Sequence, residues 1–403
     1  MRRLVLLCAA LVFVDTMLYA ALTPLLPHFA HEFGLSKARA GVLVASYAVG
    51  ALIAGLAGGV AATRLGARRA VLIGLTLMSV ASVGFAFAGD FWSLFAARLL
   101  QGLASGFTWA GAFAWLLAVV PRERRGEMMG TAMGSATFGA MFGPVVGAAA
   151  ALAGRDVVFS VLAASSVVLG VWALRIESAP GQHPSLAAVG RALRNQTFVT
   201  GLGLMSLGSL LFGTLSVLGP LHLAAAGWSA AAIGGVWLAA AAFETVQAPI
   251  TGRLSDRDSA LRPTRVALVV AAAISLALAT GARPLVYVPL IVVAAIFYAV
   301  FLTTSFALLA DGAEEAGLAQ GMSFGLMNVA WAGGAVTGPA AGGAIASATG
   351  DWIPFVLASV VCVGVLGALR GRESERRVAV KASLATPTKG PAAGADKLGV
   401  PGA

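Results

Sequence analysis

The chain has 403 residues, of which 59% are apolar and only 11% are charged, and its formal net charge is +10. About a quarter of the residues of a soluble protein carry charge, so this composition excludes an ordinary soluble fold. One membrane-spanning helix needs roughly 20 apolar residues, so the length allows about a dozen spans and leaves no room for a large soluble domain.

The first half of the chain, residues 1–175, is predicted to form six spanning helices. The first apolar segment follows Arg2 and Arg3, and a basic start of this kind is also found in signal peptides. It contains Asp15 and continues to about Pro27, which is long enough to cross a membrane, so we interpret it as the first spanning helix. Apolar windows place the six spans near residues 4–27, 38–62, 70–89, 92–119, 127–150 and 156–175.

The second half, residues 197–370, is predicted to contain six more spans. A polar central loop at residues 176–196 precedes it, and a tail at residues 371–403, rich in Ala, Gly, Pro and basic residues, is predicted to be disordered. The spans lie near residues 197–224, 230–252, 264–282, 285–310, 317–347 and 352–370. The predicted fold class is therefore an all-α membrane protein of twelve transmembrane helices in two six-helix bundles.

The distribution of Lys and Arg predicts that both termini are cytoplasmic. With that orientation the inner loops carry fifteen Lys and Arg residues without the tail, whereas the outer loops carry only Lys37, Arg39, Arg155 and Arg283. We expect a multi-pass protein of the inner (plasma) membrane. Topology explains the positive charge, so we expect the lipid bilayer rather than nucleic acid as a partner.

An internal repeat relates the two halves. The Gly and Pro pattern of the fifth span recurs 195 residues later in the eleventh span: Gly130, Gly139, Gly143, Pro144 and Gly147 correspond to Gly325, Gly334, Gly338, Pro339 and Gly342. Small residues at this spacing let helices approach closely and slide, and proline removes a backbone hydrogen bond and permits bending. The repeat predicts two pseudo-symmetric bundles with substrate between them, and it suits a rocking motion. Ordinary tight packing is the alternative for each glycine alone.

Three motifs resemble the major facilitator superfamily, in particular its drug:proton exporters of twelve helices. Residues 130–148 resemble the antiporter motif of the fifth helix, with Ala148 in place of the last glycine, and residues 325–343 form a complete second copy. Arg98-Leu-Leu-Gln101-Gly102 is similar to the family motif linked to proton movement. The loop between the second and third spans resembles the cytoplasmic signature of the superfamily through Gly59, Arg64, Gly66, Arg68 and Arg69, although Thr63 replaces the usual acid. In the equivalent loop of the second half, Asp256 and Arg257 retain part of the signature.

Three charged residues lie inside predicted spans: Asp15, Arg98 and Glu244. Each costs roughly 2.5 to 3.5 kcal/mol at the centre of a spanning helix, so we expect each to face a cavity or a partner. An acid in such a place can hold a proton in one access state and release it in another, and a cationic substrate can compete with that proton. The alternative is a buried Asp15–Arg98 ion pair that only holds helices together. The first span also resembles the opening helix of drug and vesicular-amine transporters, which implies a role for Asp15.

Aromatic and polar residues in the spans that line the cavity of this family are candidates for a substrate pocket, because rings stack planar ligands and attract cations. Ordinary packing is the alternative for each of them. The candidates are Tyr19, Gln101, Trp109, Trp115, Gln247, Tyr298, Asn328 and Trp331.

No pattern supports an enzyme, and we expect neither a cofactor nor a metal. The body of the chain has no Lys between Lys37 and Lys381, so it lacks a Walker A loop, and His28, His31 and Glu32 do not form an HExxH pattern.

We therefore predict a monomeric secondary transporter that exports a small lipophilic, in particular cationic, drug or metabolite in exchange for protons. Two alternatives remain open: a carrier of the same fold for a sugar or an amino-acid derivative without proton antiport, and a membrane receptor without transport. Flux that survives collapse of a proton gradient would favour the first alternative, and ligand binding without flux would favour the second.

Overall fold

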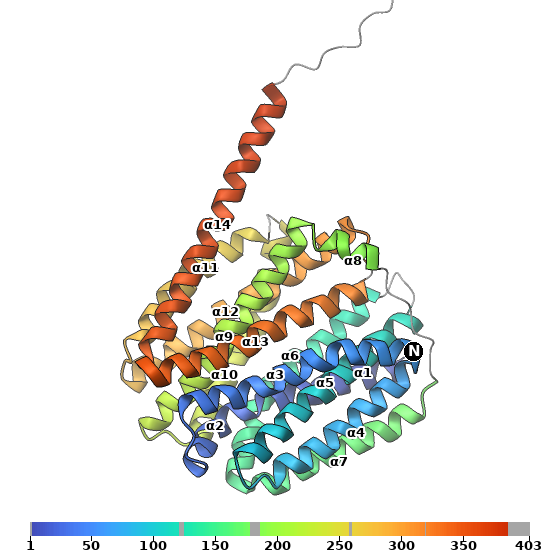
Figure 1. Ribbon diagram of the computed structural model, residues 1–403, viewed down its shortest axis with the longest axis vertical. Coiled ribbons are helices and arrows are strands. Elements are labelled where there is room, and N and C mark those ends of the chain that lie inside the picture. Colours follow the sequence, from blue (N-terminus) through green and yellow to red (C-terminus); the bar gives the residue numbers. More distant parts are fainter. Residues whose placement is uncertain (1, 121–124, 178–185, 258–259, 319, 386–403) are drawn as a thin grey trace, which may run out of the picture.

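The computed structural model describes residues 2–120, 125–177, 186–257, 260–318 and 320–385, and these residues form fourteen helices and no strand (Figure 1). The helices of the first half are α1 (Arg2–Ala20), α2 (Leu22–Glu32), α3 (Lys37–Arg64), α4 (Ala67–Ala86), α5 (Phe91–Val119), α6 (Arg125–Ala153) and α7 (Arg155–Leu174). Those of the second half are α8 (Leu186–Ala192), α9 (Gln196–Ala225), α10 (Ala230–Arg257), α11 (Leu261–Ala279), α12 (Pro284–Glu315), α13 (Gln320–Thr349) and α14 (Trp352–Ala385).

The first predicted span is a broken helix. Helix α1 ends at Ala20 and α2 begins at Leu22, although together they provide one stretch of 31 residues that is apolar enough to cross a membrane. Proline has no backbone N–H, so Pro24 cannot donate to the carbonyl of Ala20, and its ring clashes with that carbonyl. The span therefore bends at Ala21 and continues to Glu32, beyond the predicted end near residue 27.

Twelve helical stretches run side by side in the bundle, counting α1 with α2 as one and leaving out the short α8. Ten of these stretches meet the length and hydropathy expected of membrane spans in the described part of the chain. The other two, α5 and α13, have 29 and 30 residues but contain many small and polar residues. Helix α5 packs against α3 and α4, and α13 packs against α3 and α9, so both belong to the same bundle.

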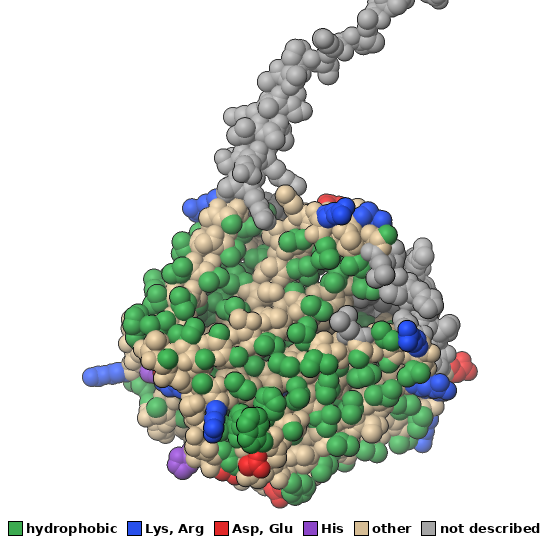
Figure 2. All heavy atoms as spheres, in the orientation of Figure 1, with side chains coloured by type: hydrophobic (Ala, Val, Ile, Leu, Met, Phe, Trp, Pro, Cys, Tyr) green, Lys and Arg blue, Asp and Glu red, His purple; other side chains and the backbone are tan. Residues whose placement is uncertain are grey.

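The surface agrees with a lipid environment. Charged side chains lie mainly toward the rim of the view, and hydrophobic side chains cover much of the face between them (Figure 2). Helix α7 exposes Val157 (54%), Val161 (64%) and Val168 (66%), which follow one side of the helix. Contiguous exposed apolar surface of this kind marks a membrane or protein contact, so α7 is placed to face lipid.

The glycine repeat of the sequence forms the same contact in each half. In the first half, Gly139, Gly143 and Gly147 of α6 lie against the backbone of α1 and of Ala21, with no room for a Cβ atom. In the second half, Gly334 and Gly338 of α13 lie equally close to the backbone of α9, and Gly342 packs against Thr214. The stripes therefore hold helices together inside each half, and the residues beside them contact the other half.

Two pseudo-equivalent contacts join the halves. Gly41 of α3 lies against the carbonyl of Pro339 and the Cα of Gly343 on α13. Gly234 of α10 faces the carbonyl of Pro144 and the side chain of Ala148 on α6. Both contacts are on what we call the distal face, which carries the turns near residues 34, 154 and 350; the opposite, termini face carries the start of α1 and helix α8.

The distal face is also closed by polar contacts between the halves. The Lys37 ammonium at the start of α3 pairs with the Asp351 carboxylate, just before α14. The backbone N–H of Ala38 donates to Ser347 Oγ of α13 at 2.8 Å. The structure is therefore closed at the distal face.

The last helix is longer than expected. We predicted that the final span would end near residue 370 and that residues 371–403 would be disordered, whereas α14 continues to Ala385 and projects from the bundle (Figure 1). Between Gly371 and Pro387 the chain has no further Gly or Pro and is rich in Ala, Arg, Glu and Lys, which favour helix. Residues 386–403 lie outside the described part of the chain.

Candidate functional site

Asp15 of α1 is 3% exposed, and one of its carboxylate oxygens accepts three hydrogen bonds. Oδ2 accepts from Tyr47 Oη of α3 at 2.9 Å, from Ser105 Oγ of α5 at 2.9 Å and from Trp109 Nε1 of α5 at 2.6 Å. Hydrogen bonds to an ionised acceptor are roughly twice as strong as neutral ones. Side chains of two other helices therefore fix the position of this carboxylate.

The second carboxylate oxygen of Asp15 is unsatisfied. Oδ1 is buried and has no hydrogen-bond partner among the described residues. Most buried polar atoms are hydrogen-bonded, so an exception calls for a physical explanation. The group is able to receive a proton or the N–H of a ligand at this oxygen while Oδ2 keeps its three donors.

Arg98 of α5 is 1% exposed and donates hydrogen bonds to carbonyls at the C-terminal end of α1. Its guanidinium donates to the carbonyls of Leu18 at 3.1 Å and Tyr19 at 3.3 Å, and to Gln101 Oε1 at 3.0 Å. The last carbonyls of a helix have no partner within it and carry partial negative charge, so a cation is stabilising there. The break at Ala21 thus creates the acceptors that hold this buried arginine.

Asp15 and Arg98 form no direct ion pair, which was one of the two expected arrangements; the ion pairs of the described residues do not join them. Tyr47 connects them instead, because its hydroxyl donates to Asp15 and its ring lies 5.0 Å from the Arg98 guanidinium carbon. A cation over a tyrosine ring is attracted by the ring quadrupole. The acid and the base belong to one network without neutralising each other by direct contact.

Aromatic rings surround this network at the junction of the halves. Tyr19 packs on Tyr47 with a centroid distance of 4.9 Å, and it meets Trp331 of α13 edge-on at 5.5 Å. On the other side, Trp109 contacts Phe113 at 5.5 Å, and Phe113 stacks on Phe324 of α13 at 5.6 Å. The second half therefore contributes Trp331 and Phe324 to a site whose polar groups come from the first half.

Five of the predicted site residues join this cluster alongside Asp15: Tyr19, Arg98, Gln101, Trp109 and Trp331. Sequence reasoning missed Tyr47, Ser105, Phe113 and Phe324. The spacing of Arg98, Gln101, Ser105 and Trp109 along one face of a helix was a signal that could have found Ser105. Nothing in the sequence singles out Tyr47.

Other predicted pocket residues lie elsewhere. Tyr298 of α12 is 1% exposed and its hydroxyl shares a 2.8 Å hydrogen bond with Ser275 of α11, so it packs inside the second half. Trp115 is fully buried and donates to the carbonyl of Glu177 at 2.9 Å. Asn328 makes no hydrogen bond that involves the described residues. Glu244 and Gln247 lie together on α10, apart from the contacts around Asp15.

The signature residues near the termini face act within one half. Gly66 has a φ of 91°, which favours glycine, and it separates α3 from α4. Arg68 donates to the carbonyl of Ile176 at 3.3 Å, next to the end of α7. Arg64 and Arg69 are exposed, and Gly59 has open space around it. The side chains of Asp256 and Arg257, at the end of α10, lie outside the described residues.

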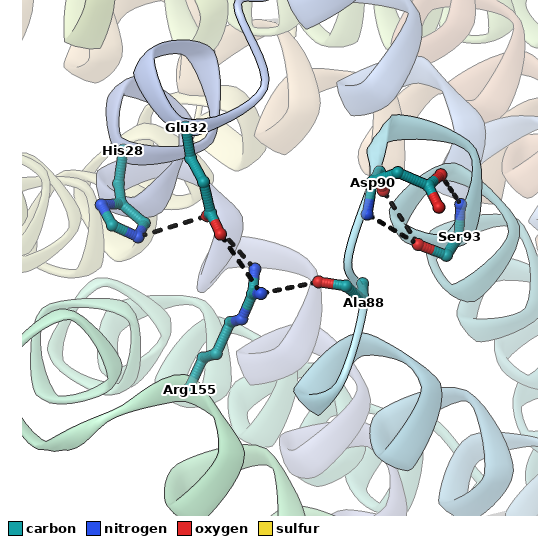
Figure 3. Close-up of polar contacts among 6 residues, drawn as sticks. All are labelled: His28, Glu32, Ala88, Asp90, Ser93 and Arg155. Atoms are coloured by element: carbon teal, nitrogen blue, oxygen red, sulfur yellow. Dashed lines mark hydrogen bonds and ion pairs between the residues drawn. The ribbon is translucent and has the colours of Figure 1, made fainter.

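A polar cluster on the distal face has a structural role (Figure 3). The Arg155 guanidinium donates to both carboxylate oxygens of Glu32 at 3.4 Å and to the carbonyl of Ala88 at 2.6 Å. His28 Nε2 lies 3.4 Å from Glu32 Oε2, and Asp90 caps the start of α5 by accepting from the backbone of Ser93 at 2.9 Å. These contacts join α2, α7 and the connection between α4 and α5 within the first half.

The sequence profile of the Major Facilitator Superfamily matches residues 6–324. The chain therefore belongs to this superfamily, whose members are membrane transporters rather than enzymes. The matched range includes the whole Asp15 network, the first glycine stripe and most of the second half up to Phe324.

Two curated relatives match shorter segments. A probable vesicular acetylcholine transporter-B of Danio rerio is 39% identical over 112 residues, which are 26% of this chain and 22% of that protein. The quinolone resistance protein NorA of Staphylococcus aureus (strain MRSA252) is 31% identical over 107 residues, which are 27% of this chain and 28% of NorA. Each match thus spans about a quarter of the relative's length.

Solved structures match nearly the whole chain. A bacterial homolog to the human lysosomal transporter Spinster, in an inward-facing and unoccupied conformation, has a TM-score of 0.73 and covers 91% of this chain and 95% of its own. The same homolog in an occupied, inward-facing conformation has a TM-score of 0.70. At 15% identity these likenesses establish the fold alone. The protein is therefore a multi-pass membrane transporter with the fold of its superfamily.

Proposed function

We propose that the chain exports a small lipophilic compound, preferentially a cation, in exchange for protons by alternating access. The observation that carries the proposal is the Asp15 carboxylate, which is buried at the junction of the halves with Oδ1 free of any partner among the described residues. Protons and cationic groups are the ligands of such an oxygen, and they compete for it. That competition is the physical basis of exchange.

The rings around Asp15 favour a lipophilic cation. Tyr47 donates to Asp15, the ring of Tyr19 packs on Tyr47, and Trp331 packs on Tyr19. Aromatic faces attract organic cations and stack planar groups. The names of the curated relatives, a quinolone resistance protein and a probable vesicular acetylcholine transporter, are compatible with this class of substrate.

Alternating access is supported by the repeat and by the closed distal face. Two halves with equivalent contacts are able to rock about a site between them. We infer from the excess of Lys and Arg in the termini-side loops that this face is cytoplasmic and the distal face is outside. The conformation described here is then closed to the outside. We further propose that the protein is located in the inner (plasma) membrane and works as a monomer.

The test is efflux from vesicles that contain the purified protein. A panel of lipophilic cations and neutral drugs is compared with and without an imposed pH gradient, for the wild type, Asp15→Asn and the matched control Asp311→Asn. The substitution Asp311→Asn makes the same chemical change at an exposed position near the end of α12. Gradient-driven efflux that disappears only in Asp15→Asn supports the proposal. Efflux indifferent to the gradient and to Asp15→Asn favours a carrier without proton antiport.

A further inference from the structure

The two intramembrane acids of the chain face opposite kinds of hydrogen-bonding groups. Asp15 accepts from Tyr47, Ser105 and Trp109, and the Arg98 cation shares its network. Donors of this kind stabilise an ionised carboxylate, whereas a neighbouring acceptor can bond only to the protonated acid. Glu244 has no such donor among the described residues, and Gln247, three residues further along its helix, has an unpartnered amide oxygen.

Glu244 lies on the inward face of α10. Ile233, Trp237 and Ala240 are buried on the same side of the helix, and Thr251 and Ser255 continue the stripe. The lipid side of α10 is formed by residues such as Phe243 (56% exposed) and Val246 (63%). Glu244 is half-buried, and it makes no hydrogen bond or ion pair with any described residue.

Gln247 has a free acceptor one helical turn from Glu244. Its Nε2 donates to Thr251 Oγ1, one turn further along α10. With its nitrogen engaged by Thr251, Gln247 has its amide oxygen left as an acceptor, and Glu244 lies three residues earlier on the same helix. Residues three apart on a helix are neighbours. Gln247 Oε1 is buried and has no partner among the described residues.

Among the described residues, no positively charged side chain forms an ion pair with Glu244. Helix α10 packs against α2, α6, α9, α11 and α12. Residues 134–153 of α6 include no titratable side chain, and the central part of α12 has only Tyr298, which bonds to Ser275. The remaining titratable groups of these elements lie near helix ends: His28, His31, Glu32, Arg125, Glu127, His222, Arg262, Arg265, Tyr287, Asp311, Glu314 and Glu315, with Arg253, Asp256 and Arg257 at the end of α10 itself. The side chains of Arg125, Glu127, Asp256 and Arg257 lie outside the described residues.

We propose that Glu244 is protonated in this conformation and donates its O–H to Gln247 Oε1, while Asp15 is ionised. Glu244 is then a second proton site, in the second half, in addition to the exchange of proton and substrate proposed at Asp15, and Gln247 is its positioning residue. This division of roles rests on the proposed proton exchange. Release transfers one proton from Glu244 to water, breaks the O–H···O contact and leaves a carboxylate; uptake reverses the step. Asp15 stays available to a cationic substrate in the first half.

Infrared spectroscopy of the purified full chain tests the protonation states without any substrate. A protonated carboxylic acid has a carbonyl stretch, separate from the amide and carboxylate bands, that shifts in D₂O. We expect such a band at neutral pH in the wild type, its loss in Glu244→Gln, and a shift to higher frequency in Gln247→Leu, where the hydrogen bond is removed. Asp15→Asn and the exposed-site control Asp311→Asn should retain the band.

Two results would overturn the inference. The first is that no protonated carboxyl band attributable to Glu244 is present at neutral pH. The second is that Asp15→Asn, and not Glu244→Gln, removes the band. A Gln247→Leu spectrum identical to the wild type would reject the role of Gln247 alone. Glu244→Gln retains the size of the side chain, and circular dichroism of each variant verifies folding. Because no transport is measured, a negative efflux result would leave this test intact.

Discussion

Lys37 at the start of α3 and Asp351 before α14 form an ion pair between the two halves of the protein. Their side chains are 39% and 29% exposed, so solvent screens the pair and its contribution is of the order of 1 kcal/mol or less. A contribution of this size stabilises the closed distal face without locking it. An equilibrium between two access states requires such a balance, because a transporter has to open again.

Charge reversal should therefore open the distal face and double reversal should close it again. We expect Lys37→Glu to raise the open population by up to about fivefold, as about 1 kcal/mol implies, and Lys37→Glu with Asp351→Lys to restore the wild-type distribution. Spin labels on cysteines introduced at Arg39 and Thr349, in a background without Cys8 and Cys362, report the distance between the halves. Equal distance distributions for the single and double variants would contradict the expectation.

The two glycine contacts between the halves should differ in sensitivity. A Cβ at Gly41 collides with the Pro339 carbonyl, whereas one at Gly234 lies 3.0 Å from the Pro144 carbonyl and 3.2 Å from the Ala148 side chain. We expect Gly41→Ala to shift the spin-label distances toward the open form more strongly than Gly234→Ala. Gly55→Ala is the control, because nothing lies within 4 Å of its Cβ position. The reverse order would show that backbone adjustment, not the static contact, decides the outcome.

The hydroxyl of Tyr47 should matter separately from its ring. Tyr47→Phe removes one of three donors to Asp15 and retains the ring beside Arg98. A hydrogen bond to a charged group is worth about 1.5–3 kcal/mol, so we expect roughly a tenfold or greater loss of gradient-driven efflux. Fluorescence-monitored thermal unfolding in detergent should show a lower Tm. Ser79→Ala, which removes a hydroxyl bonded to the carbonyl of Ala163 far from the site, is the comparison.

Arg98 should resist replacement by lysine. The guanidinium reaches the carbonyls of Leu18 and Tyr19 and the amide of Gln101 at once, and an ammonium on a flexible stem lacks that planar geometry. Each buried acceptor left without a donor costs about 1–3 kcal/mol. We expect Arg98→Lys to lower Tm in detergent more than Lys37→Ala does. An unchanged Tm would mean that other donors replace Arg98 at the end of α1.

The sequence predicted the helical architecture well because membrane spans depend on composition. Apolar windows predicted the long helices, the repeated glycines predicted close helix contacts in both halves, and the cost of buried charge predicted that Asp15 and Arg98 would have polar partners. Their connection through Tyr47 could not be predicted, because it depends on the rotation of α3 relative to α1. Tyr298 was misplaced for a similar reason: α12 is apolar on all sides, so its sequence does not indicate which face meets α11.

The discontinuity at Ala21 makes one membrane crossing into two bodies with different neighbours. Helix α1 packs against α5 and α6 of its own half, whereas α2 also touches α9 and α10 of the other half. A displacement of the second half would therefore act on α2 directly through α9 and α10, whereas α1 is held by helices of its own half. Ala21, between the two helices, is adjacent to the carbonyls of Leu18 and Tyr19 that bind Arg98. The contact between the halves and the buried polar network of the first half are thus connected through one short stretch of chain.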